Sequence, residues 1–237
     1  MFKQAGMKRL LIFSLLLNLI LLAGLAYMTQ RLGGWKYAIY RLRNSEAGVY
    51  THRKSLFEQL PAHPGAVVML GDSETSLCEW QELLGDSTTV LNRGISGDYS
   101  DGVWRRLDEV LRHKPAKIFL LIGINDLFYG NDPEAIEARY REIVQKIRHN
   151  SPDSELILQS ILPVNRKARS LPSSNEDIQA MNLRISQIAK DYALPYVDLY
   201  HELTDASGDL SLKFTDDGIH LNGLGYLVWK NTLKPYL

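Results

Sequence analysis

Two short stretches of the sequence supply a serine hydroxyl and the two groups that could activate it as a nucleophile. Gly71-Asp72-Ser73 supplies a hydroxyl, and Asp217-Gly218-Ile219-His220 supplies an imidazole base with a carboxylate to orient it. In a turn, the spacing of three residues lets Asp217 reach one imidazole nitrogen and leaves the other for Ser73. We therefore interpret Ser73, His220 and Asp217 as candidate catalytic residues, although Gly-Asp-Ser by itself is more typical of an ordinary turn.

Acyl-transfer chemistry also needs hydrogen-bond donors that face the developing oxyanion. The backbone N–H groups of Ser73 and Gly97 and the side-chain amide of Asn125 are three candidates. Glycine suits such a position because no side chain blocks the approach of substrate, and asparagine donates without adding a charge. The sequence therefore predicts an oxyanion hole formed by Ser73, Gly97 and Asn125.

A second acid–histidine pair has the same spacing, in Asp198-Leu199-Tyr200-His201. Spacing alone therefore does not choose between His220 and His201 as the base. The remaining histidines fall in predicted helices or helix-end turns, and we expect each to be a solvated surface residue: His52, His63, His113 and His149.

From residue 66 onward, short apolar runs alternate with helical patterns, which is typical of a parallel sheet with right-handed crossovers. The predicted strands cover residues 66–70, 88–91, 117–122, 156–162 and 195–198. The predicted helices cover residues 77–84, 100–113, 133–149, 174–192 and 223–233. Ser73, Gly97 and Asn125 follow the first three strands. Because the carboxyl ends of parallel strands meet at one edge, we expect these residues to be neighbours in space.

Residues 10–28 are almost wholly apolar and follow the basic residues Lys3, Lys8 and Arg9. A helix of this length reaches about 28 Å, close to the roughly 30 Å of a bilayer core. The run is longer than the core of a signal peptide, which favours an uncleaved anchor. The short basic amino-terminal tail indicates that this end stays inside and that the following domain lies outside the cytoplasm. Secretion after signal cleavage is the alternative. We divide the chain into an anchor (1–30), a connector with a first helix (31–64) and a catalytic domain (65–237).

The composition excludes several other classes of protein. The sequence has 27 basic and 27 acidic residues and no basic stripe with interleaved aromatic residues, so nucleic acid is not an expected partner. The single cysteine, Cys78, excludes an intramolecular disulfide and a cysteine-cluster metal site, and we expect it to be a packed apolar residue.

Four blocks of the sequence together resemble the SGNH hydrolases, also called GDSL esterases and lipases. They are Gly71-Asp72-Ser73, Gly94-Ile95-Ser96-Gly97-Asp98, Gly123-Ile124-Asn125-Asp126 and Asp217-Gly218-Ile219-His220-Leu221-Asn222. The resemblance spans roughly residues 50–237, and residues 92–107 look closest to the branch that contains the platelet-activating-factor acetylhydrolase catalytic subunits. The Gly-x-Ser-x-Gly elbow of α/β-hydrolases is absent, which disfavours that other serine-hydrolase fold.

This resemblance implies an α/β fold, a three-layer flavodoxin-like sandwich around a central parallel sheet of about five strands. It places the nucleophile on Ser73, the oxyanion hole on Ser73, Gly97 and Asn125, and the acid–histidine pair on Asp217 and His220. The last block also selects His220 over His201. Neither a metal nor a cofactor is expected.

The function that we predict is a membrane-anchored serine esterase that hydrolyses short-chain or acetyl esters. Its substrate would be a small-molecule, lipid or carbohydrate acyl ester, and the oligomeric state is left open. Loops at residues 74–82, 127–133 and 164–173 are expected to line the substrate pocket, with Glu74, Trp80, Phe128, Tyr129, Arg166 and Arg169. We expect the two arginines to be solvated loop charges.

Two other functions are compatible with the residues. One is a metal-dependent phosphoesterase with oxygen and nitrogen ligands from Asp72, Asn125, Asp126, Asp217 and His220. The other is an anchored binding module that keeps the fold without catalysis.

Overall fold

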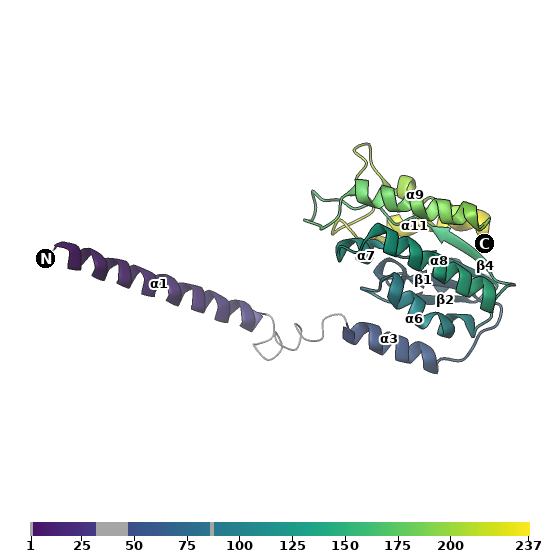
Figure 1. The fold of residues 1–237 in the computed structure, drawn as a ribbon, viewed down its shortest axis with the longest axis horizontal. Coiled ribbons are helices and arrows are strands. Elements are labelled where there is room, and N and C mark those ends of the chain that lie inside the picture. Colours follow the sequence, from purple (N-terminus) through teal and green to yellow (C-terminus); the bar gives the residue numbers. More distant parts are fainter. Residues whose placement is uncertain (1, 32–46, 86–87) are drawn as a thin grey trace. The chain divides into compact units, whose positions relative to one another are not determined.

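The computed structural model describes residues 2–31, 47–85 and 88–237, and the chain divides into two compact units, Met1–Gly48 and Val49–Leu237. In the first unit, the predicted apolar segment forms part of helix α1 (Phe2–Arg31; Figure 1). An exposed stretch of this helix, Leu10–Tyr27, is long and apolar enough to cross a membrane, a test that a signal sequence would also pass. Residues 32–46 of the predicted connector lie outside the described residues.

The second unit is built on a parallel sheet of five strands in the order β2-β1-β3-β4-β5. The strands are β1 (Val67–Gly71), β2 (Val90–Gly94), β3 (Lys117–Leu121), β4 (Glu155–Gln159) and β5 (Tyr196–Val197). All neighbouring pairs are parallel, so every carboxyl end lies at the same edge. The predicted parallel α/β sheet is confirmed, and β1 occupies an interior position in it.

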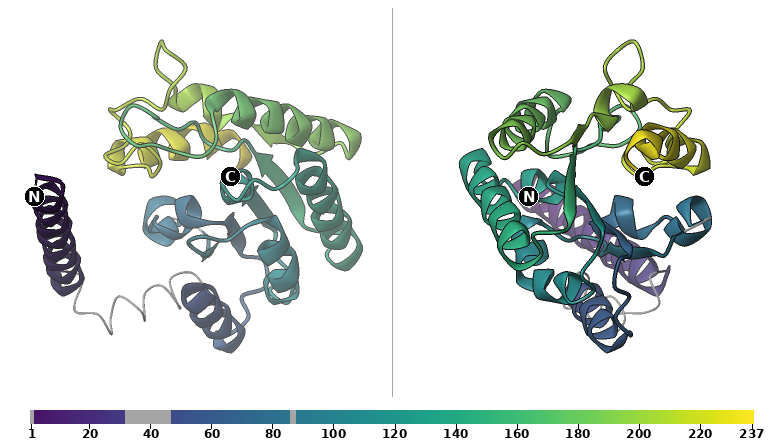
Figure 2. Two further views of the ribbon diagram at one scale, coloured as in Figure 1. Left: turned by 60° about the vertical axis from the view of Figure 1, so that its left-hand side comes forward. Right: turned by 90° about the vertical axis from the view of Figure 1, so that its right-hand side faces the viewer.

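Side chains that alternate along the strands enter two separate cores. Val68 and Leu70 of β1 pack into one core with helices α6 (Ser100–Leu111), α8 (Pro133–Asn150) and α9 (Asn175–Asp191). Val67 and Met69 pack into the other with α5 (Trp80–Leu84), α10 (Leu199–Leu203) and α11 (Gly223–Leu233). Figure 2 shows these two helical layers on opposite faces of the sheet. The three-layer sandwich is therefore confirmed.

Three short helices were not predicted, and two of them carry residues of the candidate site. Helix α4 (Ser73–Ser76) begins directly after β1, α7 (Ile124–Phe128) directly after β3, and α10 directly after β5. The helix predicted over 77–84 is reduced to α5. Elements of one turn contain too few residues to show a helical period, so they escape pattern analysis.

The expectation that His113 is a surface residue is wrong. Its side chain is fully buried, and its Nε2 lies 3.1 Å from Glu109 Oε1 and 3.1 Å from Arg93 Nη2. Arg93 in turn donates from Nε to Glu109 at 3.2 Å and lies over the ring of Phe57, in helix α3 (Ala47–Gln59). Glu109 lies one helical turn before His113, but Arg93 comes from β2, and the sequence around His113 gives no sign of this second partner. The other three, His52, His63 and His149, are exposed as predicted.

Candidate active site

Ser73 is the first residue of α4, at the point where β1 leaves the sheet. Asp72 caps this helix, because its Oδ1 accepts a hydrogen bond from the backbone N–H of Glu74 at 3.1 Å. Gly71 is required by close packing: a Cβ atom there would collide with the carbonyl oxygen of Leu121 and the hydroxyl of Thr75. The sharp strand-to-helix turn therefore presents the Ser73 side chain at the carboxyl edge of the sheet.

The side chains of Ser73, His220 and Asp217 form one hydrogen-bonded chain. His220 Nε2 lies 3.1 Å from Ser73 Oγ, and His220 Nδ1 lies 2.7 Å from Asp217 Oδ2. With the proton on Nδ1, the ring donates to Asp217 and its Nε2 is free to accept the serine proton. The distances fit a nucleophile, a base and an orienting acid.

The turn that carries His220 is held by the same carboxylate. Asp217 Oδ1 accepts hydrogen bonds from the backbone N–H groups of Ile219 at 2.9 Å and His220 at 2.8 Å. Partial burial opposes ionisation of Asp217, but these two bonds and the one from the His220 ring lower its pKa to about 2. Asp217 is therefore a carboxylate throughout the neutral range and can stabilise a positive charge on the imidazole.

The loop that carries Gly97 and the helix α7 that carries Asn125 are cross-linked to each other and to β1. Asn125 donates from Nδ2 to the carbonyl oxygen of Asp98 at 2.8 Å, which fixes the plane of its amide. The Asp98 carboxylate accepts from Arg106 Nε at 2.8 Å, and Arg106 Nη2 donates to the carbonyl oxygen of Gly71 at 3.0 Å. The end of β1, the loop after β2 and helix α7 after β3 thus share one network.

Two further features shape these loops. Gly97 has a φ of +77°, a left-handed conformation that favours glycine. Asp126, next to Asn125, accepts from the backbone N–H and the hydroxyl of Ser100 at 2.9 and 2.6 Å. The role of Arg106 in joining these segments was not predicted. In the sequence, Arg106 is marked only as a charged residue beside the apolar face that Val103, Leu107 and Val110 form on α6.

The rival histidine lies elsewhere. His201 Nδ1 is 2.6 Å from Asp198 Oδ2, but both side chains are exposed and no hydrogen bond joins His201 to Ser73. His201 instead lines a separate cavity of about 350 Å³ with Tyr196 and Tyr200. The structure therefore contains two hydrogen-bonded acid–histidine pairs with the same spacing. Only the pair Asp217–His220 contacts Ser73.

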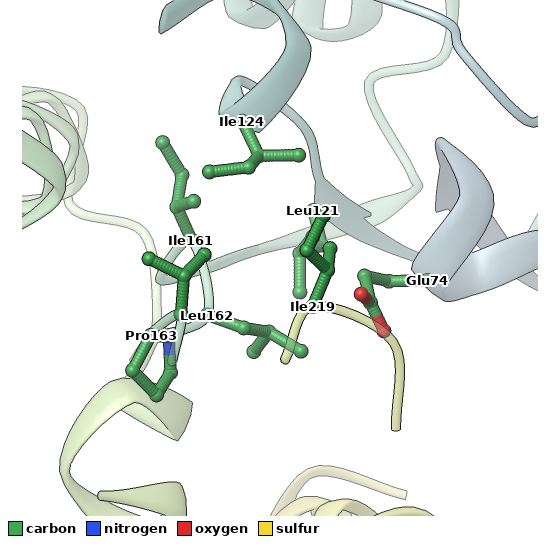
Figure 3. Close-up of a pocket in the computed structure, with 8 residues that line it drawn as sticks. Glu74, Leu121, Ile124, Ile161, Leu162, Pro163 and Ile219 are labelled. Carbon is green, nitrogen blue, oxygen red and sulfur yellow. The ribbon is translucent and has the colours of Figure 1, made fainter. Parts of the chain in front are cut away.

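A small pocket lies among residues that neighbour the candidate site in the sequence, and Ser73 is not among the residues that line it. Its walls are apolar side chains at strand ends and in the loop after β4, together with Glu74: Leu121, Ile124, Ile161, Leu162, Pro163, Val164 and Ile219 (Figure 3). Trp80 was expected here but is buried in the core, where it packs against Trp229. Glu74 and Val164 belong to the loops that were predicted to line the site, and four of the eight lining residues, 161–164, come from the segment after β4.

The two loop arginines are exposed, as expected. Arg166 has no ion pair among those found in the described chain, whereas Arg169 Nη1 lies 3.7 Å from Asp217 Oδ2. The exposure of both partners makes this contact weak. Cys78 is buried, and burial raises the pKa of its thiol to about 12, so it is the packed apolar residue that the sequence predicts.

The candidate metal ligands are not arranged as a metal site. Within residues 2–31, 47–85 and 88–237, no group of three His, Cys, Asp or Glu side chains is placed to hold a metal ion. Asp217 bonds to His220, and Asp126 bonds to Ser100. Asp72 is buried, and that burial raises its pKa to about 7. Asp217, Asp126 and Asp72 therefore each hold a neighbouring part of the chain by hydrogen bonds.

Comparison with known proteins establishes the family. The model of the GDSL-like lipase/acylhydrolase family matches residues 59–228. The chain belongs to this family and is a carboxylic ester hydrolase. The predicted resemblance to GDSL esterases and lipases is thereby confirmed.

Individual relatives agree with this assignment. The chain is 30% identical over 170 residues to thioesterase 1/protease 1/lysophospholipase L1 of Escherichia coli K12, covering 66% of this chain and 75% of the relative. A solved structure from Streptococcus pneumonia, provisionally described as a platelet activating factor, is similar with a TM-score of 0.78 and 31% identity, covering 85% and 98% of the two chains. A GDSL-like lipase of Bacteroides thetaiotaomicron shares the fold, with a TM-score of 0.68, 24% identity and coverage of 79% and 96%.

Proposed function

We propose that this protein is a membrane-anchored serine esterase that cleaves short-chain acyl esters through Ser73, His220 and Asp217. The observation that carries the proposal is the 3.1 Å separation of His220 Nε2 and Ser73 Oγ, together with the 2.7 Å bond from His220 Nδ1 to Asp217. An imidazole in this position can take the serine proton as the hydroxyl attacks an acyl carbonyl carbon.

The reaction then follows from the chemistry of these groups. Attack of Ser73 Oγ on the carbonyl carbon creates an oxyanion, which the backbone N–H groups of Ser73 and Gly97 and the Asn125 amide would stabilise. The His220 imidazolium returns its proton to the leaving alcohol, and the carbon–oxygen bond of the ester breaks. Water, deprotonated by His220, cleaves the acyl-serine in the second half-reaction. Asp217 remains ionised throughout.

A short acyl group is the simplest substrate for this site. The apolar pocket that Ile124 and Ile219 help to line has a volume of about 10 Å³, room for about one water molecule, so it offers no space for a long acyl chain. The Escherichia coli relative is named a thioesterase and a lysophospholipase, so thioesters and lysophospholipids are the other substrate classes to test. A long acyl chain would require the loop after β4 to move.

The N-terminal helix supports attachment to a membrane. Its apolar stretch, Leu10–Tyr27, can span a bilayer, and we place the catalytic unit on the extracytoplasmic side. Cleavage as a signal sequence would instead release the enzyme. Retention of the intact chain in carbonate-washed membranes supports the anchor, and recovery of a shortened chain in the soluble fraction contradicts it.

Hydrolysis by the full chain in detergent tests the esterase assignment. We expect p-nitrophenyl acetate and butyrate to be cleaved with higher kcat/KM than p-nitrophenyl octanoate, and Ser73→Ala to abolish all three activities. Equal rates for the folded Ser73→Ala variant would overturn the role of Ser73. A preference for octanoate would overturn the short-chain proposal alone.

A further inference from the structure

A buried ion pair joins the segments that carry the candidate site. The side chains of Arg106 and Asp98 are 1% and 0% exposed, and Arg106 Nε lies 2.8 Å from Asp98 Oδ2. Moving two charges out of water is costly, and apolar residues in place of such a pair often stabilise a protein. Arg106 Nη1 is also buried and has no hydrogen-bond partner among the described residues. Stability alone therefore does not account for a guanidinium group at this position.

The guanidinium of Arg106 connects two segments through one rigid plane. Its Nε donates to the Asp98 carboxylate, in the loop after β2, and its Nη2 donates to the carbonyl oxygen of Gly71 at 3.0 Å. Gly71 lies two residues before Ser73, and its carbonyl oxygen also accepts from the backbone N–H of Ile95 at 3.1 Å. Because the donors of a guanidinium have fixed directions, this group sets the separation between the end of β1 and the loop after β2.

Asp98 connects this group to both of the proposed oxyanion donors that lie outside β1 and α4. Its backbone N–H donates to the carbonyl oxygen of Ile95 at 3.1 Å, which closes the turn that contains Gly97. Its backbone carbonyl oxygen accepts from Asn125 Nδ2 at 2.8 Å. A primary amide has two N–H bonds, so this contact uses one and leaves a second that can donate to an oxyanion. A shift of Asp98 would therefore move the Gly97 backbone and turn the Asn125 amide together.

We propose that Arg106 is a positioning residue for the oxyanion hole. Through the Asp98 carboxylate and the Gly71 carbonyl oxygen, it holds the Gly97 N–H and the Asn125 amide in register with the nucleophile. Within the described part of the chain, the hydrogen bonds of Arg106 go to Asp98 and Gly71, so it acts through other residues. This inference rests on the proposed esterase function.

A double-mutant cycle separates positioning from a purely structural role. Arg106→Lys keeps the positive charge but loses the fixed pair of donors, so kcat should fall about tenfold to a hundredfold with KM little changed. In the Asn125→Ala background one of the positioned donors is already absent, so the same substitution should lower kcat no more than about threefold. Steady-state hydrolysis of p-nitrophenyl acetate by the full chain in detergent measures wild type, both single variants and the double variant.

Asp98→Asn is a second variant, with a side chain of nearly the same shape. It keeps the backbone carbonyl group that accepts from Asn125, but it removes the charge that Arg106 binds. It should therefore reproduce the loss of kcat and the dependence of that loss on Asn125. This variant decides the question even where Arg106→Lys does not fold.

The buried pair Arg93–Glu109 is a matched control. Its side chains are 4% and 3% exposed, with Arg93 Nε 3.2 Å from Glu109 Oε1, and Arg93 lies over the ring of Phe57 rather than at the candidate site. Arg93→Lys should lower the free energy of unfolding in urea, as Arg106→Lys does, because both disturb a buried ion pair. Its kcat should stay within about twofold of wild type.

The outcomes are distinct when Ser73→Ala is run beside these proteins. Ser73-dependent hydrolysis with the wild-type kcat in folded Arg106→Lys and Asp98→Asn, or with the same loss of kcat whether or not Asn125 is replaced, would overturn the role of Arg106 and leave the esterase assignment intact. An equal loss of kcat in Arg93→Lys would overturn that role as well. No Ser73-dependent hydrolysis by the wild-type protein would overturn both proposals.

Discussion

The imidazole of His220 lies 3.1 Å from the hydroxyl of Ser73, although the two residues are 147 positions apart in the chain. Ser73 is placed by a strand end and a one-turn helix, and His220 by a turn that Asp217 holds with three hydrogen bonds. The contact therefore depends on the fold as a whole, and the protein contains a natural control for it in the exposed pair Asp198–His201.

This control gives the first prediction. Asp217→Asn should lower kcat by roughly 10³–10⁴, because the amide no longer holds the imidazole in the tautomer that accepts the serine proton. Asp198→Asn alters the same residue type at the same spacing, but its histidine does not contact Ser73, so kcat should stay within about twofold of wild type. Steady-state hydrolysis of p-nitrophenyl acetate measures both. Comparable losses in the two variants would contradict the assignment of His220 as the base.

Asn125 gives a prediction about the oxyanion. Asn125→Ala should lower kcat about 10²–10³-fold with little change in KM, because the amide contributes mainly in the transition state. Asn131, whose amide is 3.5 Å from Asp126, is a control outside the proposed oxyanion hole. Near-normal turnover in Asn125→Ala would remove the amide from the proposed mechanism.

Gly97 and Gly208 share a left-handed backbone, with φ values of +77° and +80°. Alanine at either position should destabilise the protein by a similar amount, on the order of 1 kcal/mol, because of the strain on its Cβ. Only Gly97→Ala should also reduce kcat, because only Gly97 is proposed to donate to the oxyanion. Urea unfolding and esterase assays on both variants test this expectation, and full activity in Gly97→Ala would count against it.

The raised pKa of Asp72 should make the free energy of unfolding depend on pH. Its folded-state pKa is raised from 3.8 to about 7 by burial, so between these values the folded protein holds a proton that the unfolded chain has released. The free energy of unfolding of wild type, relative to Asp72→Asn, should therefore fall as the pH rises from about 4 to about 7, by up to about 1.4 kcal/mol per pH unit.

Asp205→Asn is the matched control for this effect. Asp205 also accepts from the backbone N–H two residues ahead, at Ser207, but it is exposed and its hydrogen bonds to Ser207 lower its pKa. Wild type should not lose stability relative to Asp205→Asn over the same pH range. Urea titrations at pH 4.5, 6 and 7.5 give both comparisons, and a constant difference between wild type and Asp72→Asn would contradict the prediction.

The sequence predicted the parts of the site that depend on topology. The apolar runs give the parallel strands, and parallel strands bring Ser73, Gly97 and Asn125 to one edge of the sheet. The choice between His220 and His201 came from the family resemblance, because spacing was identical for both pairs. Contacts between distant elements could not be predicted: the burial of His113 depends on Arg93 in β2, and the orientation of Asn125 depends on the Asp98 carbonyl group.

The reactivity of the Ser73 hydroxyl tests the central claim most directly. The full-length protein is treated with a fluorophosphonate, which modifies activated serines, and the adduct is located by peptide mass spectrometry. We predict one adduct, on Ser73, that forms at the wild-type rate in His201→Gln and is nearly abolished in His220→Gln. An adduct at another residue, or equal labelling of Ser73 in the two folded variants, would contradict the account.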